Sequence, residues 1–176
     1  MLYTGHGDGG FTRLIGGAAL PKCDRRLEAI GALDEAQAHL GLARALLHAT
    51  AWNPAISRVQ ADLRLLMAEL AAPETPDAFL DGAHLARLEA ELRAWDTPFR
   101  GFVTPGEGVG SAHLHVARAV IRRAERQVVG LAQAGETLSP LVITYLNRLS
   151  SWLFALAFQV DAGEADTVHI SLTSVA

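Results

Sequence analysis

Cysteine is almost absent from this chain of 176 residues. The single cysteine, Cys23, excludes an internal disulfide framework and a cysteine-rich zinc site, and it predicts a reduced thiol in a cytoplasmic protein. Long apolar runs are absent as well, because the most apolar stretch, 149–160, is short and interrupted by serines. The N-terminus also lacks the basic start and apolar stretch of a targeting segment. We therefore expect a soluble, cytoplasmic protein with no membrane attachment.

An excess of positive charge is also missing. Lys and Arg together number 15 and Asp and Glu 19, which gives a formal net charge of -4. A general nucleic-acid binder needs a basic surplus to neutralise phosphates, so this class of function is excluded. Half of the residues are apolar and 19% are charged, a composition typical of globular proteins. The length predicts one domain over 1–176, with an N-terminal loop in 1–23, a helical bundle in 24–161 and a tail in 162–176.

Five segments carry apolar residues at alternating spacings of three and four, the pattern of a helix that packs nearly parallel to a partner. These segments are Leu33–Leu47, Ile56–Leu70, Leu85–Trp95, Leu114–Leu131 and Val142–Val160. No alternation of strands and helices is visible, so a doubly wound sheet is excluded. The pattern predicts an all-α fold, a bundle of about five antiparallel helices.

Several residues mark where these helices begin and end. Asp24 is suited to cap the first helix, and Pro54 suits the first turn of the second. Gly135 is expected to end the fourth helix, and the fifth is expected to start near Pro140. The first twenty residues show no sustained period and predict an extended loop. For the tail from Gly163 to Ala176 we expect an extended or disordered chain.

The opening loop is the first feature that bundle packing does not explain. Four glycines lie between Thr4 and Thr12, and they permit the unusual backbone angles with which loops point several N–H groups at a phosphate. The loop is not a Walker motif, because no Gly-Lys-Ser/Thr follows it. On its own it is equally compatible with a floppy terminus.

The second feature is a row of four arginines in nine residues, from Arg118 to Arg126, with Glu125 as the one acid among them. At 100° per residue, Arg118, Arg122 and Glu125 fall within about 60° of one another on one helix face. Such a row is often simply solvated. Its density in an acidic protein also suits a polyanion, because the forked guanidinium matches phosphate oxygens.

The third feature is Asn147, which lies with Arg148 inside the otherwise apolar last helix. A buried asparagine must find hydrogen-bond partners, so structural satisfaction and ligand contact are both open. The neighbouring aromatic residues Trp152, Phe154 and Phe158 suit either a large flat ligand or the core. A di-iron site is excluded because no Glu-x-x-His occurs, and a Gly-x-Ser-x-Gly nucleophile elbow is absent too.

Taken together, five motifs resemble, in order and over most of the chain, those of the PduO-type ATP:cob(I)alamin adenosyltransferases. They are Thr4-x-x-Gly7-Asp8-x-Gly10-x-Thr12-x-Leu14, Lys22-x-Asp24-x-Arg26-x-Glu28-Ala29-x-Gly31-x-x-Asp34-Glu35, Phe102-Val103-Thr104-Pro105-Gly106, Leu114-His115-Val116-Ala117-Arg118 with Arg122-Arg123-Ala124-Glu125-Arg126, and Tyr145-Leu146-Asn147-Arg148-Leu149-Ser150. The chain departs from the family in having Ser151-Trp152 where Asp-Tyr is common.

The resemblance implies a ferritin-like, cobalamin adenosyltransferase-like bundle that forms a homotrimer with ATP between neighbouring subunits. It implies transfer of the 5′-deoxyadenosyl group of ATP to the cobalt of cob(I)alamin, with Mg²⁺. The triphosphate is then held by the N-terminal loop and Lys22. The implied loop residues are Thr4, Gly5, Gly7, Asp8, Gly10 and Thr12.

The resemblance also implies roles for residues of the bundle. Arg122 and Glu125 contact the nucleotide or its metal, Arg126 is a further candidate, and Asn147 contacts ATP. The implied catalytic residues are Asp34, Phe102, Arg118 and Arg122. Asp34 and Arg118 pair across the subunit interface, and Phe102 keeps the lower ligand off the cobalt.

Two other interpretations compete with catalysis. One is a non-catalytic bundle that binds ATP or corrinoid as a sensor or carrier, and the other is a plain structural bundle. If the chain is the enzyme, its expected partners are a flavin-dependent reductase and an adenosylcobalamin-dependent enzyme.

Overall fold

The computed structural model describes residues 3–15, 17, 19–72, 79–95 and 103–173, and the side chains among them up to Gly163. The described residues form five helices and one short hairpin. The helices are α1 (Arg25–Leu46), α2 (Trp52–Ala71), α3 (Gly82–Ala94), α4 (Val109–Gln133) and α5 (Pro140–Thr173). The predicted all-α bundle of five helices is confirmed.

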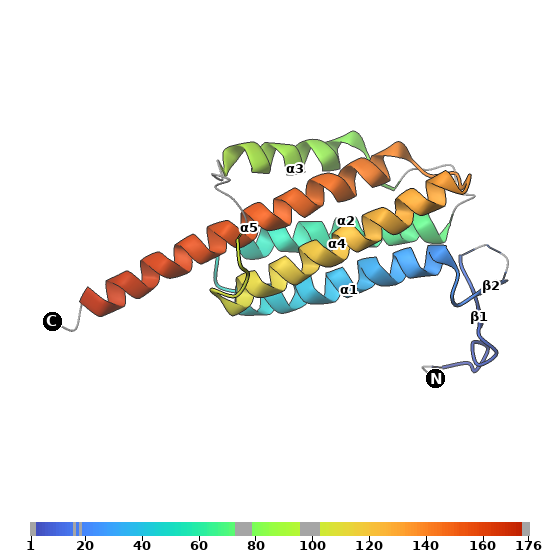
Figure 1. The fold of residues 1–176 in the computed structure, drawn as a ribbon, viewed down its shortest axis with the longest axis horizontal. Coiled ribbons are helices and arrows are strands. Elements are labelled where there is room, and N and C mark those ends of the chain that lie inside the picture. The colour runs from blue at the N-terminus through green and yellow to red at the C-terminus, as the bar shows by residue number, and fades with distance from the viewer. Residues whose placement is uncertain (1–2, 16, 18, 73–78, 96–102, 174–176) are drawn as a thin grey trace.

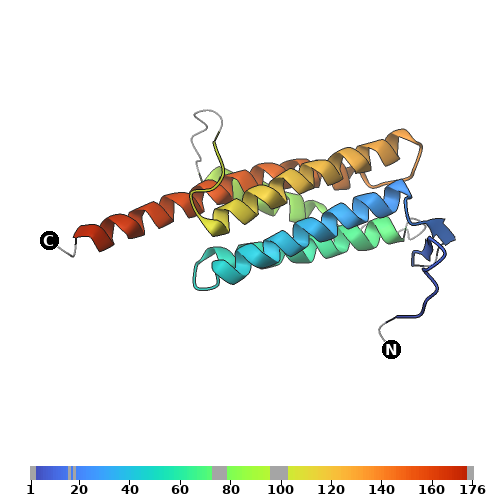
Figure 2. The same cartoon turned by 60° about the horizontal axis from the view of Figure 1, so that its bottom comes forward.

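The helices lie side by side as a bundle, with α3 along the outer side of α5 (Figure 1). α1 packs against α2 and α4, and α4 packs in turn against α5, as the turned view also shows (Figure 2). The α1–α4 pair is antiparallel, because Glu35 contacts Arg123 whereas the later His39 contacts the earlier His113. The last turns of α5 extend past the end of the bundle in both views.

The apolar seams predicted for four of the five helices are buried. Leu33 of α1, Leu63 of α2, Ile121 of α4 and Leu153 of α5 are each 0% exposed. α3 differs, because Leu88 is its one buried residue. Leu92 and the C-cap residue Trp95 are partly buried against the core, and polar contacts add to this packing.

The predicted helix ends are also confirmed. The Asp24 carboxylate accepts a hydrogen bond from the backbone N–H of Arg26 at 2.8 Å and so caps α1. Pro54 lies in the first turn of α2, where its missing N–H removes no helical hydrogen bond. Gly135 follows α4 with φ at +90°, a conformation that a side chain would strain.

Two expectations about the chain ends were wrong. The first twenty residues are not all irregular, because β1 (Phe11–Arg13) and β2 (Ala19–Pro21) pair as an antiparallel hairpin. Three-residue strands are too short to show a period in the sequence. The tail is helical as far as Thr173, since no proline follows Pro140 and a single Gly163 costs a helix only about 1 kcal/mol.

One part of α5 is apolar enough to cross a membrane by length and composition, namely Pro140–Gly163. In the structure 56% of its apolar window is buried against the other helices. The apolar character of this helix is therefore accounted for by its place in the bundle core.

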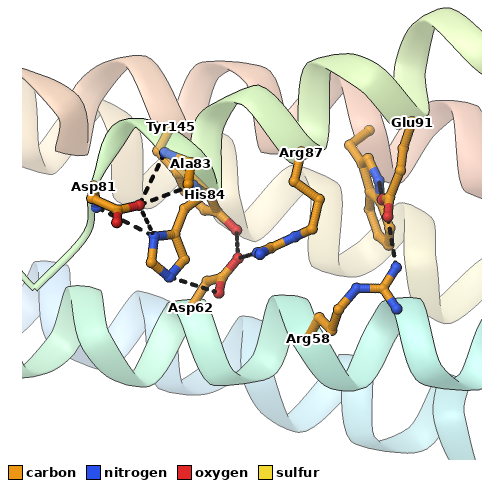
Figure 3. A network of polar contacts seen from close by, with 9 residues as sticks. Arg58, Asp62, Asp81, Ala83, His84, Arg87, Glu91 and Tyr145 are labelled. Atoms are coloured by element: carbon orange, nitrogen blue, oxygen red, sulfur yellow. Dashed lines mark hydrogen bonds and ion pairs between the residues drawn. The ribbon is translucent and has the colours of Figure 1, made fainter.

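The buried carboxylate of Asp62 joins α2 to α3 and α5 (Figure 3). Asp62 of α2 accepts a hydrogen bond from the Tyr145 hydroxyl of α5 at 2.6 Å and forms an ion pair with Arg87 of α3. Nε2 of His84, also on α3, lies 3.8 Å from Asp62 Oδ1. Burial, and then the charge of Asp62, raise the pKa of Tyr145, so this hydroxyl stays protonated and remains a donor.

A second carboxylate, that of Glu91 on α3, also contacts both α2 and α5. Glu91 accepts a hydrogen bond from Trp152 Nε1 of α5 at 2.7 Å and forms an ion pair with Arg58 of α2 at 2.6 Å. Trp152 is fully buried, so of the two roles open to it from the sequence the core role is confirmed.

We expect Asp62→Ala to lower the free energy of unfolding by about 2–3 kcal/mol, because it leaves the buried Tyr145 hydroxyl and Arg87 without their acceptor. Urea unfolding at pH 7 measures the change. Arg64→Ala, at an exposed position on the same helix, serves as the control and should change the value by less than about 0.5 kcal/mol. Equal effects of the two substitutions would contradict the role of Asp62.

Candidate functional site

The N-terminal loop folds into two successive turns that lead into the hairpin. Gly5 and Gly10 have φ of +73° and +81°, and these values explain why glycine stands at both positions. The Asp8 N–H donates to the Gly5 carbonyl at 3.1 Å, and the Gly10 N–H donates to the Gly7 carbonyl at 3.2 Å. The loop is therefore an ordered turn structure.

A hollow of about 420 Å³ opens beside these turns. It is lined by Thr4, His6, Gly7, Phe11, Thr12, Arg13 and Ala19. Three residues predicted for phosphate binding, Thr4, Gly7 and Thr12, thus share one cavity. The polar lining combines hydroxyl groups with two basic side chains, which suits an anionic ligand.

Lys22 reaches the same loop from the end of the hairpin. Its backbone N–H donates to the Gly10 carbonyl at 2.8 Å. Its ammonium group lies over Gly7, because a Cβ added at Gly7 would be 2.8 Å from Lys22 Nζ. A side chain at position 7 would displace the ammonium group of Lys22, so glycine is needed there for Lys22 to keep this position. The fold therefore places a positive charge next to the glycine-rich loop.

A second hollow, of about 320 Å³, lies between α4 and α5. It is lined by Arg122, Glu125, Arg126, Val129 and Asn147. The family resemblance implied that four polar residues of the helical bundle contact the nucleotide, and all four line this one cavity. Among the described residues neither arginine has an ion-pair partner, so both guanidinium groups are available to an anion.

Asn147 connects the two helices at this hollow. Its Nδ2 donates a hydrogen bond to Glu125 Oε1 at 3.0 Å, and its Oδ1 accepts one from Arg148 at 2.9 Å. Asn147 is exposed, so the polar side chain is not a buried asparagine satisfied by the core.

The structure separates other members of the arginine row from this hollow. Arg123 is engaged by Glu35 of α1, and Arg118 lines neither cavity. Within the part of the chain that the structure describes, no ion pair joins Arg118 to Asp34, which is exposed on α1. Phe102 lies outside the described residues. No group of three or more potential metal-binding side chains occurs among the described residues.

His115 lies three residues before Arg118 on α4 and is buried, with 5% of its surface exposed. Its ring meets Phe154 edge to face at a centroid distance of 6.0 Å, and neither ring nitrogen has a hydrogen-bond partner among the residues that the structure describes. Burial, and secondly the charge of Arg118, lower the pKa of His115. The imidazole is thus held neutral beside Arg118.

Sequence reasoning missed several residues that line the two hollows. They are His6, Phe11, Arg13, Ala19 and Val129. His6 and Arg13 are part of the glycine-rich segment, and their basic side chains were the available signal. Phe11 lies in β1 and Ala19 in β2, and the sequence did not reveal that these two strands pair.

The family model for cobalamin adenosyltransferases matches residues 2–160 of the chain, which include both hollows. The chain belongs to the cobalamin adenosyltransferase family. The family resemblance inferred from the five motifs is thereby confirmed.

Individual members of the cobalamin adenosyltransferase family support the assignment. The chain is 38% identical to the corrinoid adenosyltransferase MMAB of Bos taurus over 169 residues, which covers 89% of this chain and 69% of the relative. It is 36% identical to a corrinoid adenosyltransferase of Citrobacter freundii over 163 residues, with coverage of 89% and 92%.

A solved structure shares the fold throughout. It is a variant PduO-type ATP:corrinoid adenosyltransferase from Lactobacillus reuteri complexed with cobalamin and ATP. The TM-score is 0.84 at 31% identity, with coverage of 94% of this chain and 96% of that chain.

The buried, neutral state of His115 predicts a dependence of stability on pH. At pH values between the lowered pKa of His115 in the folded chain and about 6.5, the imidazole binds a proton in the unfolded chain but not in the folded chain. The free energy of unfolding should therefore fall as the pH falls through this window, by at most about 1.4 kcal/mol per pH unit from this group. Urea unfolding between pH 7.5 and 5.5 should show a shallower slope for His115→Leu than for wild type.

His48→Leu provides the control, because His48 is exposed and should retain the wild-type slope. If His115→Leu also keeps that slope, the ring is not held neutral by the fold.

Proposed function

We infer that the chain transfers the 5′-deoxyadenosyl group of ATP to the cobalt of a reduced corrinoid and releases triphosphate. Family membership over residues 2–160 supports this activity. The observation that carries it at the level of the site is the hollow at which Glu125 and Asn147 meet two guanidinium groups that have no ion-pair partner in the described part of the chain. Such a set recognises a nucleotide polyphosphate rather than a neutral ligand.

The chemistry requires no general base from the protein. Cobalt(I) is the nucleophile: its electron pair forms the Co–C bond to the 5′ carbon, and the C–O bond to the triphosphate breaks with its electrons on oxygen. The protein aligns the two substrates, excludes water and stabilises the charge of the leaving group. Arg122 and Arg126 provide positive charge on one side, and Lys22 with its glycine loop provides it on the other.

Mg²⁺ fits this arrangement through Glu125. Magnesium commonly binds one or two protein carboxylates together with phosphate oxygens of the substrate, so a cluster of three protein ligands is not required. The carboxylate of Glu125 borders the hollow beside both arginines. When bound, the ion would neutralise phosphate charge. Asn147 orients the carboxylate of Glu125 through the 3.0 Å hydrogen bond from its Nδ2.

The active unit in this proposal is a homotrimer with its sites between subunits. Support comes from the two hollows, which share no lining residue in the single chain. We propose that the loop of one subunit faces the arginine hollow of its neighbour. Asp34 and Arg118, which have no ion-pair partner among the described residues of the chain, would then pair across the interface.

We also propose roles for Phe102 and for two partner enzymes. Phe102 would lie below the corrin and keep the lower ligand away from cobalt, which makes cobalt(II) easier to reduce. A flavin-dependent reductase would supply the cobalt(I) form, and an adenosylcobalamin-dependent enzyme would receive the product. The single exposed thiol, Cys23, is consistent with a cytoplasmic location.

Arg122→Ala should lower kcat/KM about 30- to 1000-fold, because a charge-assisted contact to the leaving group contributes about 2–4 kcal/mol in the transition state. Anaerobic incubation with ATP and cob(I)alamin, followed by loss of the cobalt(I) spectrum, measures the rate. Arg123→Ala is the matched control, since the neighbouring arginine is engaged by Glu35 and does not line the hollow.

Similar rates for the two variants would refute the role of Arg122. A wild-type chain that binds ATP, as seen by a thermal shift, but never consumes cob(I)alamin would favour the sensor or carrier function instead.

A site between subunits predicts that two inactive variants restore each other. When Lys22→Ala and Arg122→Ala chains are co-expressed, about a quarter of the interfaces in randomly mixed rings combine an intact loop with an intact arginine hollow. Activity should therefore return to about a quarter of the wild-type value. Co-expression of Arg122→Ala with a Lys22→Ala/Arg122→Ala double variant, a mixture that contains no intact arginine hollow, should restore none. Equal activity of the two mixtures would show that each chain carries a complete site.

A further inference from the structure

Arg148 forms contacts that the proposed reaction does not use. Its Nη1 donates a hydrogen bond to Asn147 Oδ1 at 2.9 Å, and its Nε donates one to Glu89 Oε1 at 3.1 Å. Asn147 in turn donates to Glu125 at 3.0 Å. A continuous row of polar contacts therefore runs from α3, through α5, to the arginine hollow on α4.

The chemistry of the row fixes the orientation of the Asn147 amide. A guanidinium group has only donors, so the atom of Asn147 that faces Arg148 must be the oxygen. An ionised carboxylate has only acceptors, so the atom that faces Glu125 must be the nitrogen. An asparagine amide otherwise has two nearly equivalent orientations about its last torsion. Arg148 and Glu125 together exclude one of them.

The pair of Arg148 and Glu89 is poorly suited to a role in stability. Their side chains are 44% and 34% exposed, and exposed ion pairs contribute little to the folded state. Glu89 also has a second basic neighbour, Arg93, whose Nη1 lies 3.9 Å away, but Arg93 does not contact Asn147. What distinguishes Arg148 is thus its contact with a residue that lines the hollow.

We propose that Arg148, held by Glu89, is a positioning residue that presents the Asn147 amide to the nucleotide in one orientation. The amide N–H and the oxygen lone pair that remain after the contacts to Glu125 and Arg148 are the groups offered to ATP. The proposal rests on the proposed function in one respect, namely that Asn147 contacts ATP.

A double-mutant cycle on Arg148 and Asn147 tests this assignment. Arg148→Met should raise the KM for ATP about three- to tenfold and leave kcat within about twofold, because the lost contact orients a binding group. In the Asn147→Ala background the same Arg148→Met change should have no further effect on KM, since no amide is left to orient. Glu89→Gln should raise the KM by a smaller factor and should likewise be silent in that background.

Arg93→Met is the matched control: it removes the other basic neighbour of Glu89 and should leave the KM unchanged. The melting temperatures of all variants should stay within about 2 °C of wild type. Independent, multiplicative effects of Arg148→Met and Asn147→Ala on the KM would overturn the proposal and make Arg148 a direct ligand. An unchanged KM in Arg148→Met would overturn it as well. Failure of the proposed function appears separately, as a wild-type chain without adenosyl transfer.

Discussion

The rotation of α4 about its own axis is the constraint on which the candidate site depends. Leu114, Ile121 and Val128 bury one face of this helix against α1 and α5. At 100° per residue, that burial leaves Arg122 and Glu125 toward the edge shared with α5, where Asn147 completes the hollow. The rotation of α4 about its axis therefore sets both which residues are buried in the core and which residues line the hollow. A substitution that rotates α4 about its axis would displace Arg122 and Glu125 from the hollow.

α5 has to meet two different requirements along one helix. Its apolar seam packs into the bundle, and α3 is attached to it both by apolar packing around Leu88 and by the hydrogen bond from Trp152 to Glu91. Directional contacts such as this hydrogen bond help to fix the lateral position of α3. Since Arg148 of α5 contacts Glu89 of α3, the placement of α3 also reaches the environment of Asn147.

The sequence predicted those features that depend on helical periodicity. The seams and the caps at Asp24 and Gly135 follow from spacing and local hydrogen bonding, and so does the shared face of Arg122 and Glu125. Features created by contacts between distant segments were missed. The β1–β2 hairpin has strands too short to leave a pattern, and the burial of His115 depends on where Phe154 of another helix lies. The helical tail was missed because a polar segment with one glycine carries no strong signal for or against a helix.

The position of Lys22 over Gly7 has a consequence for chemical labelling. The 15 basic residues of the chain are 14 arginines and this one lysine, so a reagent selective for amines has a single side-chain target. That target is the ammonium group that lies on the glycine loop. Acylation of Lys22 would therefore place a label beside Gly7, which lines one of the two hollows and not the other. The loop thus has a natural position for a chemical label that needs no engineered residue.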